Sequence, residues 1–267
     1  MSRTLERVAS VEGIGFWAPR LPCWAVAREA LRGSAIEFGE GARKPAPALL
    51  PSTERRRASD SVVLAMEVAV QACQSAGRDP RTVPGVFASM HGDLAITDYT
   101  CATLAAAPTQ MSPIRFHNSV HNAPAGYWSI GTGCRAPYTA LAADVHTFAE
   151  GLLEAFVQLS DGQDEVLLVA YDIEACGPLA MVSPSTGLLG MALVLGSPES
   201  QGSGIRLTWD ICEPMRTTTP RPGEASALAG NAMAAGLPLF EALAADTASL
   251  VTLDLSRGLS LRVRVSP

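Results

Sequence analysis

The sequence predicts an α/β protein in which a mainly parallel sheet is covered by helices on both faces. Three runs, at 84–89, 165–171 and 187–196, are almost entirely apolar, which is typical of strands buried on both faces. Amphipathic helical stretches separate several of these runs. With 267 residues, of which 48% are hydrophobic, the chain is long enough to bury a full-sized core.

The first predicted elements are a strand at 8–16 and a helix that begins after Ser59. The strand contains Gly13-Ile14-Gly15, but position 18 is alanine, so the spacing of a phosphate-binding glycine loop is not met. Ser59 is a favourable N-cap and Gly77 a natural C-terminal stop for the helix. Its apolar stripe consists of Val62, Ala65, Met66, Ala69, Val70 and Cys73.

The middle of the chain continues the alternation of strand and helix. After the strand at 84–89, a loop holds His91. Its position could make it face a pocket, but we expect it to be exposed, as a single loop histidine usually is. A helix is expected near 97–107, and a strand at 138–143. The next helix has an apolar stripe at Phe148, Leu152, Ala155, Phe156 and Leu159.

The last third predicts strands at 187–196 and 204–211, a helix at about 225–245, and a terminal hairpin. The hairpin strands, 250–255 and 259–265, are joined through Arg257-Gly258, a typical turn sequence.

Charge and cysteine content exclude several classes of function. The net charge of −6 argues against nucleic acid or an anionic membrane surface as a partner. The longest uncharged run is interrupted by proline and glycine, so we expect no membrane span. Six evenly spread cysteines without metal-ligand spacing predict reduced thiols, a cytoplasmic location, and no metal or other cofactor.

One segment, residues 112–145, carries a family resemblance. It contains Ser112-Pro113, Asn122, Ala125-Gly126 and Arg135-Ala136-Pro137, followed by a strand and a turn into a helix. In this order and spacing it resembles the core of the β-ketoacyl synthases of the thiolase-like superfamily. Laid on that pattern without a gap, the catalytic cysteine of the family falls on Val145.

The resemblance implies a thiolase-like layered fold with one complete half and a truncated second half. We expect a ketosynthase-like N-terminal half at 1–200 and a shortened C-terminal remnant at 201–267, packed on the same core. The family places further catalytic histidine and lysine residues late in the chain, whereas the last histidine here is His146. The prediction is therefore a non-catalytic protein. Asp144 is expected to cap the helix that follows.

A polar cluster in the same segment is the expected contact surface. By resemblance, it lies along the twofold interface of the family and lines the floor of the partner's acyl tunnel. A satisfied polar network within one subunit explains the cluster equally well. The residues concerned are His117, Asn118, Ser119, His121, Asn122, Tyr127, Trp128, Pro137 and Tyr138.

The resemblance favours a chain-length-factor-like subunit, similar to those of aryl polyene and xanthomonadin-type pigment pathways. Its expected partner is a full-length β-ketoacyl synthase, in a heterodimer, and direct contact with an acyl carrier protein is left open. The alternative is an enzyme, an acyltransferase or shortened condensing enzyme, with Cys134 as nucleophile and His117 or His121 as base. A buried structural role for Cys134 competes with that alternative. A homodimeric scaffold is the third hypothesis.

Overall fold

The computed structural model describes residues 7–34, 41–198, 204–245 and 247–267. The strands are β1 (Val8–Trp17), β2 (Gly85–Ala88), β3 (Tyr138–Leu141), β4 (Glu165–Asp172), β5 (Leu189–Gly196), β6 (Arg206–Cys212), β7 (Ser249–Leu255) and β8 (Leu259–Ser266). The α-helices are α1 (Trp24–Leu31), α2 (Ser52–Arg57), α3 (Asp60–Ala76), α4 (Leu94–Ala106), α5 (Pro113–His117), α6 (Ala123–Thr132), α7 (Thr147–Ser160), α8 (Glu224–Ala227) and α9 (Leu237–Ala244). Four 3₁₀ turns are η1 (Pro108–Gln110), η2 (Pro178–Met181), η3 (Ala234–Gly236) and η4 (Ser256–Gly258).

All the strands in the described residues belong to one eight-stranded sheet, in the order β3-β2-β4-β5-β1-β6-β8-β7. Only β2 is parallel to its neighbours, β3 and β4, while the other pairings are antiparallel. The expectation of a mainly parallel sheet was therefore wrong. A strand covered on both faces is apolar throughout whichever way it runs, so composition does not reveal its direction.

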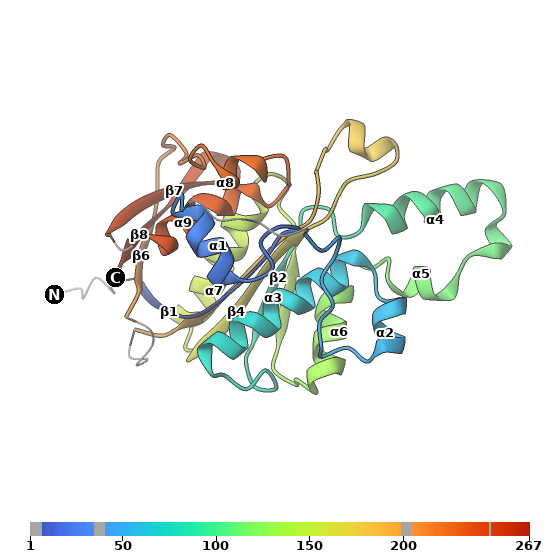
Figure 1. The fold of residues 1–267 in the computed structure, drawn as a ribbon, viewed down its shortest axis with the longest axis horizontal. Helices are drawn as coiled ribbons and strands as arrows, with labels where there is room; N and C mark the ends of the chain where they lie inside the picture. The colour runs from blue at the N-terminus through green and yellow to red at the C-terminus, as the bar shows by residue number, and fades with distance from the viewer. Residues whose placement is uncertain (1–6, 35–40, 199–203, 246) are drawn as a thin grey trace.

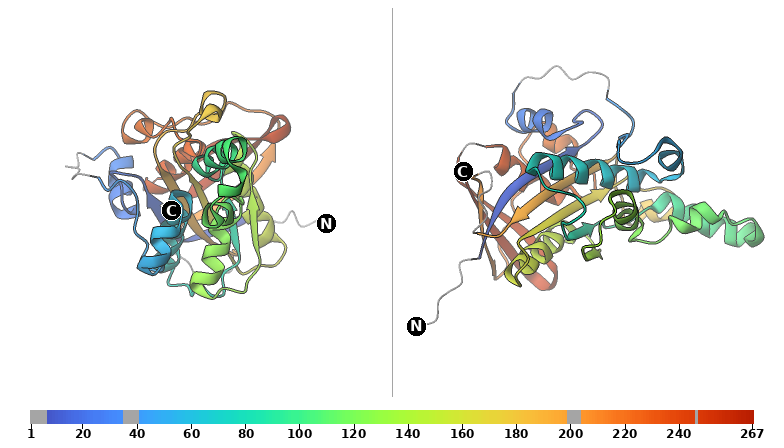
Figure 2. Two further views of the ribbon diagram at one scale, coloured as in Figure 1. Left: turned by 90° about the vertical axis from the view of Figure 1, so that its right-hand side faces the viewer. Right: turned by 90° about the horizontal axis from the view of Figure 1, so that it is seen from below.

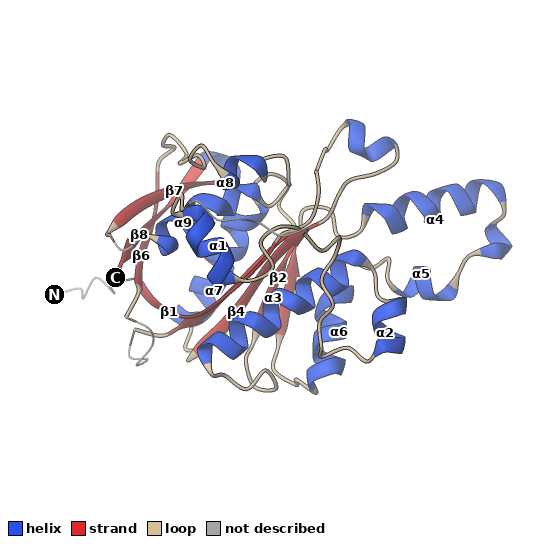
Figure 3. Ribbon diagram, viewed as in Figure 1, coloured by secondary structure: helices blue, strands red, loops and turns tan. Residues whose placement is uncertain are grey.

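Helices cover both faces of the sheet, as expected (Figures 1 and 3). One core cluster packs α1, α7 and α9 against the sheet, and a second packs α3 and α6 against the opposite face. The helix α3 lies close on β1 because β1 has glycines there. A β-carbon on Gly13 would stand 2.2 Å from the carbonyl oxygen of Ala72, and one on Gly15 would stand 2.1 Å from that of Val68.

One helix has its expected bounds and another does not. The helix α3 runs from Asp60 to Ala76, with Gly77 in the left-handed conformation at its C-cap, as the sequence indicates. The single helix expected at 225–245 was wrong, because the segment forms α8, the 3₁₀ turn η3 and α9 instead. Gly230 and Gly236 interrupt the run, and Pro238 occupies the first turn of α9, where proline is tolerated.

The last strands extend the sheet of the first half. The strand β6 pairs with β1 through Ser10↔Arg206, Ala9↔Leu207 and Val8↔Thr208, and the hairpin β7–β8 continues outward from it. The proposed boundary between 200 and 201 falls within 199–203, outside the described residues, so the division at that position stays a prediction.

An arm built from α4, η1 and α5 extends away from the sheet (Figures 1 and 2). Only Leu94 and Ile96 of α4 are buried. The 16 residues from 99 to 114 carry no charged side chain. No helix of the described residues is long and apolar enough to cross a membrane.

Candidate functional site

Three neighbouring strands end at one edge of the sheet and bring separate segments together. Because β3, β2 and β4 are parallel neighbours, their carboxyl ends meet at the same place, which we call the carboxyl edge. The turn after β3, the loop 89–93 after β2, and the loop 173–186 after β4 all begin there. In open α/β sheets this is the edge where sites are commonly built.

The turn from β3 into α7 holds Val145, at the position where the family resemblance places a nucleophile. Val145 is 58% exposed. Asp144 before it has φ 52°, a left-handed conformation that aspartate tolerates better than most residues. The hydroxyl of Thr147 accepts from the backbone N–H of Ala143 at 2.9 Å and donates to the carbonyl of Asp144 at 2.6 Å.

Asp144 does not cap α7, so that expectation was wrong. The helix begins at Thr147, and its N-cap residue is His146, which makes no side-chain capping bond. The left-handed backbone at Asp144 delays the helix beyond the position that the sequence pattern indicates.

Asp172, the last residue of β4, forms a buried polar centre at the carboxyl edge. Its carboxylate accepts from the Ser89 hydroxyl at 2.9 Å and from the backbone N–H groups of Met90 and His91 at 2.8 and 3.1 Å. The residue is fully buried, and this burial raises the pKa of its carboxyl group to about 7 although the three donors oppose the rise. Asn231 donates to its backbone carbonyl at 3.2 Å.

His91 lies between Asp172 and Ser183. Its Nε2 is 2.7 Å from the Ser183 hydroxyl, and its Nδ1 is 3.7 Å from Oδ1 of Asp172. The His91 side chain is only 7% exposed, so the expectation of an exposed loop histidine was wrong. Burial lowers the pKa of His91, and the negative charge of Asp144 opposes this effect. This environment favours the neutral form of the ring, which can accept a proton.

The polar cluster expected at an interface divides into two groups. His117, Asn122 and Tyr127 line a groove of about 730 Å³ between α2, α5 and α6. The ring of His117 meets Tyr127 edge to face at 6.1 Å, and Nδ2 of Asn122 is 3.5 Å from the Tyr138 hydroxyl. Pro137 and Tyr138 are exposed at the β3 edge. These side chains are available for contact with a partner.

The remaining members are engaged within the chain. Asn118 is 4% exposed and donates to the carbonyl of Arg57 at 3.0 Å. Ser119 donates to the carbonyl of Phe116 at 2.8 Å. Nε2 of His121 is 2.8 Å from the carbonyl of Ser89, and Trp128 lies in the core. These contacts hold the four residues within the chain, but Oδ1 of Asn118 and Nε1 of Trp128 are buried without a hydrogen-bond partner among the described residues. The network is therefore not fully satisfied, and the interface role of the cluster stays a prediction.

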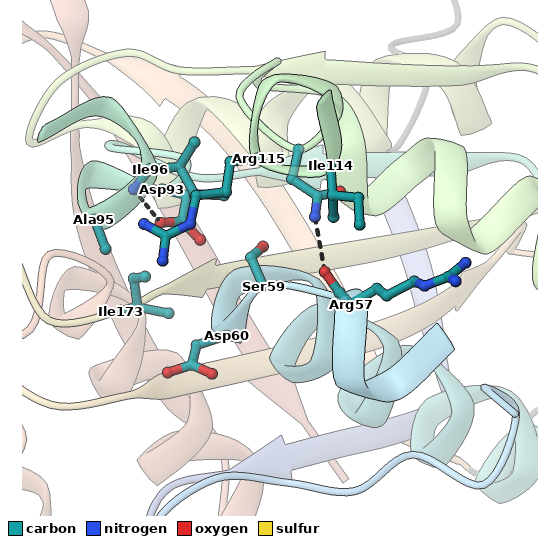
Figure 4. A pocket seen from close by; sticks show the side chains of 10 residues that line it. Arg57, Ser59, Asp60, Asp93, Ala95, Ile96, Ile114, Arg115 and Ile173 are labelled. Carbon is teal, nitrogen blue, oxygen red and sulfur yellow. Dashed lines mark hydrogen bonds between the residues drawn. The ribbon is translucent and has the colours of Figure 1, made fainter. Parts of the chain in front are cut away.

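A smaller cavity of about 240 Å³ adjoins the groove (Figure 4). Arg57, Asp60, Asp93 and Arg115 contribute its charged lining. Asp93 accepts from the backbone N–H of Ile96 at the start of α4 and from the Ser61 hydroxyl, each at 3.0 Å, so it serves the local structure. Among the residues that the structure describes, no cluster has the side chains needed to hold a metal ion.

Cys134, the alternative nucleophile, follows the end of α6 and is 9% exposed. Its sulfur donates to the carbonyl of Val83 at 3.8 Å within the core cluster beneath α3 and α6. Of the histidines suggested as its base, His121 contacts Ser89 and His117 faces Tyr127. This environment is that of a small buried apolar side chain.

Thiol alkylation tests the environment of Cys134. In the native protein we expect iodoacetamide to modify Cys101, which is exposed, at least about 10-fold faster than Cys134 or Cys73. Burial raises the pKa of the Cys73 thiol to about 12, which removes its reactive thiolate at neutral pH. Peptide mass spectrometry after timed labelling measures the rates, and unfolding in urea should make them similar. Rapid native labelling of Cys134 would favour the enzyme hypothesis.

The mixed sheet between two helical layers, with a strand running into a tight turn and a helix, defines a thiolase-like fold. The model of the β-ketoacyl synthase N-terminal domain matches residues 30–257. The chain therefore belongs to that family. A search of the curated proteins found no match.

Several solved structures share the fold. The chain aligns with a ketosynthase (ApeO) in complex with its chain length factor (ApeC) from Xenorhabdus doucetiae at 20% identity and a TM-score of 0.71, covering 97% of this chain and 99% of that one. The ishigamide ketosynthase/chain length factor aligns at 13% identity and a TM-score of 0.70, covering 97% and 99%. A β-ketoacyl synthase from Burkholderia phymatum aligns at 12% identity and 0.67, covering 98% and 99%.

Proposed function

We propose that this protein is a chain-length-factor-like subunit that pairs with an active, full-length β-ketoacyl synthase and does not itself condense acyl groups. The observation that carries the proposal is Val145, which stands exposed at the turn where the family has its nucleophile. A valine side chain cannot form the acyl thioester that condensation requires.

The free edge of β3 supports the pairing. Within the described part of the chain, β3 pairs with β2 alone, through bonds from the N–H groups of Gly85 and Ser89 to the carbonyls of Pro137 and Leu141. By the alternation of a strand, the backbone groups of Tyr138 and Ala140 point outward. An edge of this kind is a template for pairing with another chain.

The surface beside that edge is apolar enough for a stable interface. Ile114, Val120 and Ile130 line the groove and are exposed, with Ile130 at 82%, and Phe116 is exposed on α5. Exposed apolar side chains gathered in this way mark interaction sites. We expect the interface with the synthase to exceed about 2,000 Å² and to be largely apolar, as lasting interfaces are.

We assign the subunit to fatty acid or polyketide-type synthesis, with aryl polyene products as the leading case. An acyl carrier protein is a further proposed contact. All six cysteines are unpaired, which fits a reducing compartment such as the cytoplasm.

Co-expression tests the proposal. With a full-length β-ketoacyl synthase that carries cysteine and histidine, we expect a 1:1 complex that survives size-exclusion chromatography. The chain alone should give no condensation product from an acyl thioester and a malonyl thioester. A stable homodimer that binds none of the synthases tested would support the scaffold hypothesis instead. Condensation by the isolated chain would overturn the proposal of a non-catalytic subunit.

A further inference from the structure

A serine, a histidine and an aspartate meet at the carboxyl edge in the order that nucleophilic catalysis requires. Ser183 comes from the loop after β4, His91 from the loop after β2, and Asp172 from the end of β4. The serine oxygen is 2.7 Å from Nε2 of His91, within hydrogen-bond range, while Nδ1 on the far side of the ring faces Asp172 at 3.7 Å. We propose that these three residues form an acyl-transfer site in which Ser183 attacks an ester or thioester.

The orientation of the histidine suits a general base. Nδ1 of His91 is buried and makes no hydrogen bond within the described residues. An approach of about 0.8 Å would bring it into hydrogen-bond range of Asp172. Above about pH 7, where Asp172 is ionised, the proton on Nδ1 is directed at its carboxylate, and Nε2 is left to accept the proton of the Ser183 hydroxyl. Catalytic hydrogen bonds are often long before substrate binds.

The loops that carry Ser183 and His91 are held in place by further contacts. The backbone N–H of Ser183 donates to the carbonyl of Leu179 at 2.9 Å, and that of Ala175 donates to the carbonyl of Ser185 at 2.8 Å. Asn231 donates to both Asp172 and Thr186, at 3.2 Å each, and so ties the end of β4 to the far end of the serine loop. Groups held in this way need little rearrangement to react.

The surroundings of Ser183 indicate the class of substrate. Leu179, Met181 and Val182 immediately precede it and are 44%, 88% and 78% exposed. Such side chains would pack against an apolar acyl chain rather than a charged group. We therefore assign an activated acyl group with an apolar chain, presented as an ester or thioester.

The reaction balances with water as the acceptor. The Ser183 oxygen forms a bond to the acyl carbon while His91 takes the hydroxyl proton. The carbon–sulfur or carbon–oxygen bond of the substrate then breaks, and the leaving group takes that proton. A water molecule, deprotonated by His91, cleaves the acyl-serine ester to release the acid, and the proton returns to the serine oxygen.

Labelling of the full-length chain with a fluorophosphonate, which modifies activated serines, tests the site. We expect an adduct on Ser183 and hydrolysis of a butyryl thioester. Ser183→Ala should abolish both, and His91→Gln should lower their rates at least about 100-fold. Ser34→Ala, at an exposed serine after α1, should change neither. In Ser183→Cys, the new thiol should be alkylated faster than Cys101, because His91 takes its proton.

The absence of an adduct on Ser183, or hydrolysis that survives Ser183→Ala, would overturn the proposal. Slow alkylation of the Ser183→Cys thiol would also overturn it, because it would show that His91 holds the loop without acting as a base. The proposed hydrolysis at Ser183 does not require the synthase. Co-purification of Ser183→Ala with the synthase therefore tests the proposed pairing separately.

Discussion

Replacement of Ala140 by proline is expected to weaken binding to the synthase by about 100-fold. Proline removes the outward N–H of β3 and adds a ring at the strand edge. A buried carbonyl of the synthase is then left without its donor, which costs roughly 1–3 kcal/mol, and the upper end of this range corresponds to about 100-fold in affinity. The chain itself should stay folded, because proline is tolerated on an edge strand where the N–H faces away from the sheet. Titration of the purified synthase with each variant, followed by calorimetry, gives the dissociation constants.

The opposite edge of the same sheet provides a matched control. In β7, the backbone N–H and carbonyl of Thr252 are bonded to Thr218, so Leu250, two residues earlier, also directs its N–H away from β8. Leu250→Pro should leave synthase binding unchanged. Equal weakening by both substitutions would show a general loss of structure, and unchanged binding of Ala140→Pro would place the interface elsewhere.

The stability of the protein should depend on pH through Asp172. The folded-state pKa of Asp172 is raised from the ordinary 3.8 to about 7. The stability that the protonated carboxyl group gives to the folded protein is therefore fully present below about pH 4 and is lost as the pH rises through 7. A rise of this size corresponds to roughly 4 kcal/mol. Asp172→Asn does not titrate, so between pH 4 and pH 8 we expect the free energy of unfolding to fall by about that much in the wild type relative to the variant.

Urea denaturation at several pH values measures this difference. His91 and the other titrating groups are present in both proteins, so their contributions largely cancel in the comparison. A difference in the free energy of unfolding that stays constant from pH 4 to pH 8 would show that Asp172 remains ionised in the folded protein, held by its three hydrogen-bond donors.

Local chemistry made some elements predictable. The helix α3 lies between Ser59 and Gly77 as expected, and Gly77 forms its left-handed C-cap, although the side chain of Ser59 makes no capping bond. The terminal hairpin follows from Arg257-Gly258, which forms the turn between β7 and β8. The family motif located the turn at Val145, although the left-handed Asp144 moves the start of α7 to Thr147. Each of these features is decided within a few residues of sequence.

The pairing of the strands and the meeting of Ser183, His91 and Asp172 depend on contacts between residues that are distant in the sequence, so no local pattern predicts them. The strand β1 lies between β5 and β6, which no local pattern indicates. Ser183 and His91 are 92 positions apart, so their contact follows only from the order of the strands. One signal was present in the sequence. Residues 166–171 of β4 are a buried run that ends in Asp172, and a carboxylate at the end of a buried strand needs hydrogen-bond partners.

The attachment of β6 to β1 has a consequence for the final 60 residues. Without them, the backbone donors and acceptors on one side of β1 would be unpaired. Copies of the protein could then associate by pairing β1 with a strand of another copy. The terminal strands thus shield the protein against self-aggregation.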